Sequence, residues 1–199
     1  MKFLDALLGR TKPRPAKLDA LFALPGAAIA LETEAGLRPS GQAGVCFKPV
    51  PGGSFASVGR EVRELLKLTE DKSQALREED DRYGYHWVVL EGTTLEELVT
   101  DIHMVNVTLE ESGFGPQLLC SVFGFRPGAE TAETAEAAEG SGIYLVYLYK
   151  RGTFYPFAPL AGERRDNELE LRIRALLGEE LPVESELGRW FPIWGAPLV

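Results

Sequence analysis

The sequence has few of the residues from which metal centres and redox sites are built. It contains two cysteines and two histidines in 199 residues. Cys46 and Cys120 each lie inside an apolar, strand-like run and outside any C-x-x-C pair, which predicts buried, inert thiols. His86 and His103 belong to no metal-ligand motif and are predicted to be partly buried structural residues. We therefore expect no metal and no redox chemistry.

Long apolar runs are also scarce. The stretch 20–31 is interrupted by Pro25 and Gly26, and it falls short of the roughly 18 residues needed to cross a bilayer. The first ten residues include Asp5 and Arg10, so their apolar stretch is too short for a signal peptide. These features predict a cytoplasmic chain without a transmembrane helix.

Catalytic motifs are missing as well. The sequence has no glycine-rich phosphate loop of the dinucleotide or P-loop type, which argues against a nucleotide cofactor. The nearest string to a nucleophile elbow is 52–56, Gly-Gly-Ser-Phe-Ala, which lacks the final glycine. Its Ser54 is better explained as a helix N-cap. The sequence thus predicts a binding or accessory protein with no cofactor rather than an enzyme.

Charge is divided unevenly along the chain. The net charge is −9, but residues 1–17 hold five basic residues against Asp5, which gives +4 and leaves −13 for the other 182 residues. Such an acidic body repels phosphates and lacks the basic patch of a nucleic-acid binder, so we expect no nucleic-acid partner. Only residues 1–17, the N-terminal arm, suit an anionic surface.

The N-terminal arm combines an apolar stripe with a basic linker. Its large apolar residues recur at helical spacing over two turns, and Pro13 and Pro15 follow. The stripe is predicted to dock on a partner or on the inner face of an anionic membrane, and packing on the protein's own sheet is the alternative. The residues predicted to dock are Phe3, Leu4, Leu7, Leu8, Arg10 and Lys12.

The remainder, residues 18–199, is predicted to form a single α+β domain. Helices are expected at 18–24, 54–68, 94–112, 165–177 and 184–190, and strands at 28–32, 45–50, 83–90, 117–125, 143–150 and 153–157. Thr94 and Glu97 form a capping box. The charged stretch 68–81 is predicted to be a surface loop, and the acidic stretch 128–142 a mobile hairpin loop. This order predicts a mixed or mainly antiparallel sheet of about five to six strands with helices packed against it.

Aromatic residues supply one candidate surface. They crowd the predicted hairpin 144–157 and the tail 190–194. A sheet that is apolar on both faces must be covered twice, by the chain itself, by a partner or by a second copy. We therefore expect a homodimer or a complex with a partner protein. The predicted partner surface contains Tyr155, Trp190, Phe191 and Trp194.

Basic residues supply the rival interpretation, an enzyme or sensor that binds a small anionic ligand. Two basic pairs flank the predicted strand 153–157, and the second lies at the start of a predicted helix. The predicted anion site contains Lys150, Arg151, Arg164 and Arg165. The simpler explanation is that these residues are solvated or paired with neighbouring carboxylates along the helix.

Several long strings resemble a known family. They are KFLDALLGRTKP, DALFALP, GVCFKPV, FGPQLLCSVFGF, YLVYLYKRGTFYPFAPL, GERRDN and RWFPIWGAP. From Met1 to about Pro197 the chain resembles PspAB, the PspA-associated protein of phage-shock-type envelope-stress clusters. The resemblance implies association with PspA or another stress-response protein, and it implies no known reaction. The expected element order is also similar to secretion-chaperone-like domains, which would imply a dimer and a peptide-binding role.

Overall fold

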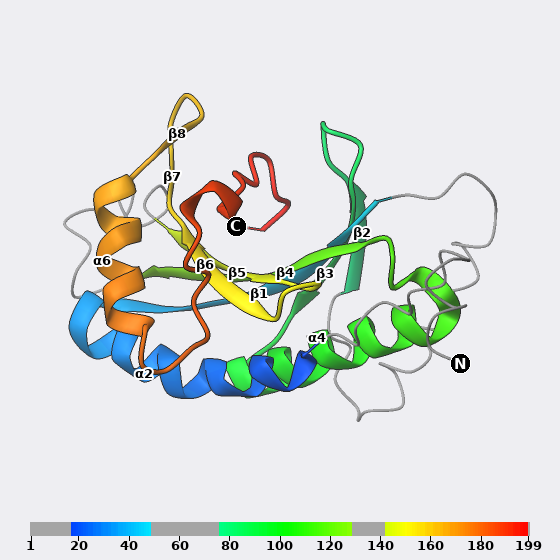
Figure 1. The fold of residues 1–199 in the computed structure, drawn as a ribbon, viewed down its shortest axis with the longest axis horizontal. Coiled ribbons are helices and arrows are strands. Elements are labelled where there is room, and N and C mark those ends of the chain that lie inside the picture. The colour runs from blue at the N-terminus through cyan, green and yellow to red at the C-terminus, as the bar shows by residue number, and fades with distance from the viewer. Residues whose placement is uncertain (1–16, 49–75, 129–141, 199) are drawn as a thin grey trace, which may run out of the picture.

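A six-stranded antiparallel sheet forms the centre of the fold (Figure 1). The computed structural model describes residues 17–48, 76–128 and 142–198. In spatial order the strands are β2 (Leu76–Asp80), β3 (His86–Glu91), β1 (Leu37–Phe47), β4 (Leu118–Pro127), β5 (Ile143–Leu148) and β6 (Thr153–Phe157). All five neighbouring pairs are antiparallel. The predicted α+β class and the predicted strand number are therefore confirmed.

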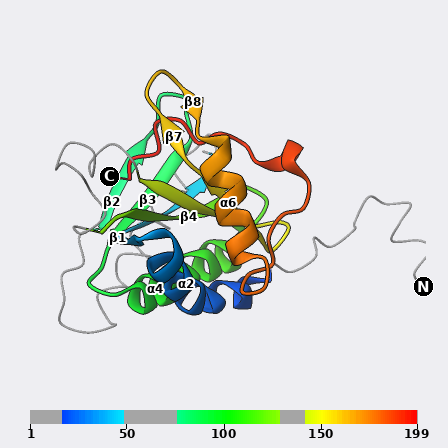
Figure 2. The same cartoon turned by 90° about the vertical axis from the view of Figure 1, so that its left-hand side faces the viewer.

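Helices cover one face of this sheet and its β6 end (Figures 1 and 2). They are η1 (Leu18–Ala23), α2 (Leu24–Ala35), α4 (Leu95–Leu109) with its π-helical end η2 (Glu110–Phe114), and α6 (Asn167–Leu177). Leu31, Ile102 and Ile173, one from each long helix, are fully buried in the core on this face. A short ladder of β7 (Pro159–Leu160) and β8 (Arg164–Arg165) precedes α6.

Helix α4 begins where the capping box predicts. The Thr94 hydroxyl accepts a hydrogen bond from the Glu97 amide at 3.2 Å, while the Glu97 carboxylate accepts one from the Thr93 hydroxyl at 2.6 Å. In the middle of the helix, the buried Asn106 side chain donates to the Ser121 hydroxyl of β4 at 2.8 Å. This hydrogen bond inside an apolar core fixes α4 against the sheet.

The strand predicted at 28–32 is wrong, because these residues belong to α2. Pro25 and Gly26 suggest a stop in the sequence, but Pro25 stands in the first turn of α2, where its missing N–H is not needed. The helix ends at Gly36, whose φ of +66° is the left-handed conformation that closes helices. A short run of alanine and aliphatic residues fits both the helical and the strand period. The proline in the first turn and the glycine at the C-terminal end therefore decide in favour of a helix.

The surface loop predicted at 68–81 is wrong for its last residues, which form the edge strand β2. Four charged residues in a row argue against a strand by composition, yet Arg77, Glu78 and Glu79 pair in register with Val89, Val88 and Trp87 of β3. Charged residues are typical of edge strands because they discourage pairing with other chains.

Four further predictions concern one short turn and three segments outside the described residues. The helix predicted at 184–190 is only the 3₁₀ turn η3 (Leu187–Arg189). The helix predicted at 54–68 lies outside the described residues, as do residues 129–141 of the acidic loop predicted at 128–142 and the arm up to residue 16.

Candidate binding cleft

The sheet face opposite α2 and α4 carries a second apolar cluster. Its buried members from the strands include Trp87, Val89, Val122, Val146, Tyr155 and Phe157. The C-terminal segment, residues 183–198, crosses this face and adds the buried Trp190 and Leu198 (Figures 1 and 2). The doubly apolar sheet expected from the sequence thus receives part of its second cover from its own chain.

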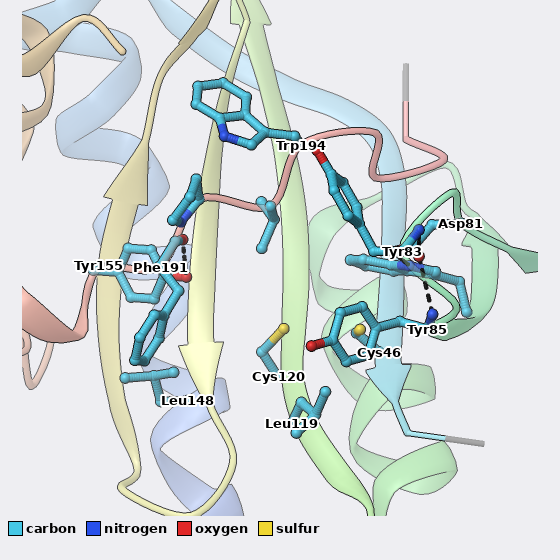
Figure 3. A pocket seen from close by; sticks show the side chains of 13 residues that line it. Cys46, Asp81, Tyr83, Tyr85, Leu119, Cys120, Leu148, Tyr155, Phe191 and Trp194 are labelled. Atoms are coloured by element: carbon cyan, nitrogen blue, oxygen red, sulfur yellow. Dashed lines mark hydrogen bonds between the residues drawn. The ribbon is translucent and has the colours of Figure 1, made fainter. Parts of the chain in front are cut away.

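An apolar cleft of about 670 Å³ lies between the C-terminal segment and the β2–β3 turn. Its lining residues are Cys46, Asp81, Tyr83, Tyr85, Trp87, Leu119, Cys120, Leu148, Tyr155, Phe191, Pro192, Ile193 and Trp194. Figure 3 shows Tyr83 and Tyr85 on one side, Tyr155 and Phe191 on the other, and the two cysteines between them. The rim is aromatic and exposed to solvent, since Tyr83 is 51% and Phe191 60% exposed.

Asp81 shapes the side of the cleft formed by the β2–β3 turn. Its Oδ1 accepts hydrogen bonds from the amides of Tyr83 and Tyr85 at 2.8 and 2.9 Å, and its Oδ2 accepts one from the Trp87 indole at 3.0 Å. Gly84 completes the turn with a φ of +79°. Asp81, the one charged residue in the lining, therefore has both oxygens engaged and holds the two tyrosines at the rim.

The opposite side is held by hydrogen bonds from the sheet to the C-terminal segment. The Tyr155 hydroxyl donates to the Phe191 carbonyl at 2.8 Å, and the Tyr144 hydroxyl donates to the Leu198 carbonyl at 2.8 Å. Burial raises the pKa of both tyrosines, so they remain neutral donors. The hydroxyl of Tyr155 is thereby used within the protein, and the cleft presents its ring.

Glu184 fixes the start of the C-terminal segment. Its carboxylate is buried and accepts hydrogen bonds from Arg151 Nε at 2.5 Å, Thr153 Oγ1 at 3.0 Å and the Glu186 amide at 3.1 Å. Burial raises the pKa of Glu184, but the hydrogen bonds from Glu186, Arg151 and Thr153 outweigh burial and hold the pKa below its ordinary value. The charged carboxylate thus ties the segment to the β5–β6 hairpin.

The two cysteines lie side by side on the floor of the cleft. Cys46 of β1 and Cys120 of β4 are Cα partners in the sheet, and both are free and buried. A hydrogen bond with Cys120 raises the pKa of the Cys46 thiol far above its ordinary range, and burial raises it further. A thiol that stays protonated is a poor nucleophile, and it packs like a small apolar side chain. The prediction of buried thiols is confirmed, but the sequence did not indicate that they are neighbours.

Three of the four residues in the predicted partner surface line one cleft. They are Tyr155, Phe191 and Trp194. The fourth, Trp190, is buried beneath the surface, with its ring 6.0 Å from that of Tyr155. Sequence reasoning missed Tyr83 and Tyr85, because their alternation with Trp87 was interpreted as the start of a strand. The shape of the turn that exposes them depends on Asp81.

The four residues of the predicted anion site fall into two separate pairs. At the β5–β6 turn, Lys150 donates to the Pro116 carbonyl at 2.8 Å and Arg151 pairs with Glu184. Near α6, Arg164 donates to the Ala161 carbonyl at 3.2 Å. Arg165 pairs with Glu170 at 2.9 Å and also lies over the Phe157 ring. Each side chain thus has a protein partner, and the anion site stays a prediction.

Phe3, Leu4, Leu7, Leu8, Arg10 and Lys12 lie outside the described residues, and their docking stays a prediction. Within the described ranges, no three His, Cys, Asp or Glu side chains are grouped so that they could hold a metal ion. None of the helices in the same ranges combines the length and apolar character required to cross a membrane.

Fold and cleft together define an α+β protein with an aromatic cleft on the sheet face away from its helices. Searches of curated proteins and of solved structures gave no match to the chain. A family match was found over residues 1–198, nearly the whole chain, and the family is PspA associated protein B. The chain therefore belongs to the PspAB family, as its sequence strings indicated. This is an accessory family of the PspA system and not a known enzyme family.

Proposed function

We propose that this chain is a non-enzymatic accessory protein of the PspA envelope-stress response, and that it binds a protein partner in the aromatic cleft. Membership of the PspA-associated family supports the accessory role. The cleft supports binding, because it joins three rim aromatics, Tyr83, Tyr85 and Phe191, to an apolar floor. Aromatic side chains are the residues that most often dominate binding energy at protein interfaces.

The polar groups of the cleft support a non-covalent role. Asp81 has both oxygens engaged, and the Tyr155 hydroxyl donates to the chain's own backbone. The raised pKa of the Cys46 thiol keeps it from acting as a thiolate nucleophile near neutral pH. Because these polar groups are already engaged, the cleft offers a partner mainly apolar contact. An amphipathic helix laid into a groove is the recurring mode of recognition that matches such a surface.

The family relationship makes PspA the first partner to test. Binding of purified PspA to the full chain can be measured by calorimetry, with Phe191→Ala and Tyr85→Ala as cleft variants. Each should weaken binding about tenfold or more, since truncation of an exposed aromatic side chain that the partner buries removes a large share of the binding energy. Leu187→Ala is the matched control, because Leu187 is 52% exposed but does not line the cleft.

Two results would contradict the proposal. One is binding of PspA with unchanged affinity to both cleft variants, which would place the interface elsewhere. The other is no binding of PspA to the full chain at tens of micromolar. Light scattering on the chain alone tests the homodimer expected from the sequence, and a clean monomer at these concentrations would leave the partner complex as the only assembly.

A further inference from the structure

We propose that the N-terminal arm of the chain itself occupies the aromatic cleft when no partner is present. The inference concerns the chain alone and does not depend on which partner later binds. The lining of the cleft contains no basic residue and one engaged carboxylate, Asp81. An occupant of this surface needs several large apolar side chains and no acidic excess.

The described structure begins next to one end of the cleft. A Cβ atom added to Gly152 would lie 2.8 Å from the Lys17 Cβ, so Lys17 packs directly on the β5–β6 turn. The Gly152 amide donates to the Leu148 carbonyl at 2.8 Å, and Leu148 lines the cleft. In Figure 3, Leu148 and Leu119 stand at the end of the cleft nearest this turn. The arm thus leaves the body at the β5–β6 turn, on the helix side of the sheet, and reaches the cleft around this turn.

The length of the arm is sufficient to reach across the cleft. Leu8 and Lys17 are nine peptide links apart, and an extended chain covers about 30 Å over that number of links. The cleft runs across the strands from β6 to β3, and these four strand spacings amount to about 20 Å. The apolar stripe can therefore reach any part of the cleft. A short tether also gives an effective concentration on the order of millimolar, so a contact too weak for a free peptide is populated within one chain.

Charge and composition single out the arm among the segments outside the described residues. Residues 1–16 carry four basic residues against Asp5 together with the large apolar stripe. Residues 49–75 hold equal numbers of basic and acidic residues, and residues 129–141 hold four glutamates and no large apolar residue. The 182 residues outside the N-terminal arm carry −13, and the cleft lining is almost entirely apolar. A basic, apolar segment complements an acidic body with an apolar cleft, and the arm is the one with both properties.

Photo-crosslinking on the full chain tests the inference directly. A benzoylphenylalanine in place of Phe3 should crosslink within the same chain to the peptides around Tyr83–Trp87 or Phe191–Trp194, as identified by mass spectrometry. The same probe at Phe22 is the positional control. Phe22 is exposed, and its ring lies 5.0 Å from that of His103 on α4, so its crosslinks should stay on the helix side of the sheet.

A pair of double variants separates apolar docking from charge. Leu7→Asp with Leu8→Asp should lower the crosslink yield at Phe3 about tenfold or more, because two buried apolar side chains become charged. Ala6→Asp with Gly9→Asp changes the net charge equally but lies on the opposite side of the stripe, and it should retain most of the yield. The far-ultraviolet spectrum confirms that both variants fold.

The inference is overturned if the probe at Phe3 gives no crosslink, or if it labels only α2, α4 or α6. It is also overturned if the crosslinked product is a dimer on a denaturing gel, since the occupant would then be a second copy. These outcomes are independent of PspA binding, so failure of this inference and failure of the proposed function can be told apart.

Discussion

Glu184 shows how one buried residue positions a whole side of the cleft. Its carboxylate gathers the Arg151 guanidinium, the Thr153 hydroxyl and the Glu186 amide, while its own carbonyl accepts from the Trp190 indole at 3.0 Å. Its backbone also pairs with Phe154 of β6. Loss of the carboxylate charge should therefore loosen the C-terminal segment and the cleft wall that this segment forms.

Glu184→Gln should lower the free energy of unfolding at pH 7 by about 1.5–3 kcal/mol, the range for hydrogen bonds to charged groups. The amide keeps the shape of the side chain but loses the charge and one acceptor. Urea unfolding followed by tryptophan fluorescence measures the loss, because Trp190 and Trp194 lie in the same segment. Glu180→Gln, an exposed carboxylate a few residues earlier, should change stability little.

The difference in unfolding free energy between wild type and Glu184→Gln should depend on pH. The pKa of Glu184 is lowered in the folded state, so its stabilisation is present above the ordinary carboxyl pKa of about 4.3 and is lost as the pH falls through the folded pKa. The difference in unfolding free energy between wild type and Glu184→Gln should thus be constant from pH 7 to 5 and shrink below about pH 4. An equal difference at every pH would show that the charge of Glu184 does not matter.

Part of the candidate cleft could be predicted from the sequence because aromatic residues are concentrated in two short segments. Tyr155, Phe191 and Trp194 stand out as aromatic residues crowded in short segments. Tyr83 and Tyr85 could not be recognised, since their exposure depends on the three hydrogen bonds that Asp81 accepts. The pairing of Cys46 with Cys120 depends on strand order, which local patterns do not encode.

At the scale of elements, local signals succeeded where they were strong and failed where tertiary contacts decide. The hairpin of β5 and β6 and the cap of α4 follow from alternation and from Thr94. Residues 28–32 of α2 were predicted to be a strand because a short apolar run fits the helical and the strand period alike. Strand β2 has the composition of a loop, and it forms because β3 offers a free edge to pair with.

The connection between β4 and β5 offers a test at this scale. Phe125 of β4 and Ile143 of β5 are register partners, so the two strands already lie side by side where the connection begins and ends. Residues 129–141 have glutamates at every third position and no large apolar residue to bury. A short Gly/Ser turn in their place should leave the melting temperature within a few degrees. A loss of folding on calorimetry would show that the segment makes contacts essential to the sheet.

At the scale of the whole molecule, the chain separates a basic, apolar arm from an acidic body. The arm carries +4 and the remainder −13. If the arm occupies the cleft as proposed, charge and apolar contact would hold it there, and an anionic membrane would compete for the same two properties. Two helical turns are too short to be stable alone, so the helix predicted for the stripe would need a surface to contact. Membrane docking and occupation of the cleft are therefore alternatives for the same side chains.

Co-sedimentation with vesicles tests the membrane alternative. The chain should bind anionic vesicles and not neutral ones, because Arg10, Lys12 and Arg14 each add about 1 kcal/mol near anionic lipid. Salt should weaken the binding, and Leu7→Asp with Leu8→Asp should abolish it. Since the arm cannot lie in the cleft and on a membrane at once, anionic vesicles should also reduce the crosslink from Phe3 to the cleft. If vesicle binding is never seen while the double variant lowers the melting temperature by about ten degrees, the arm belongs to the protein's own surface and membrane docking is wrong.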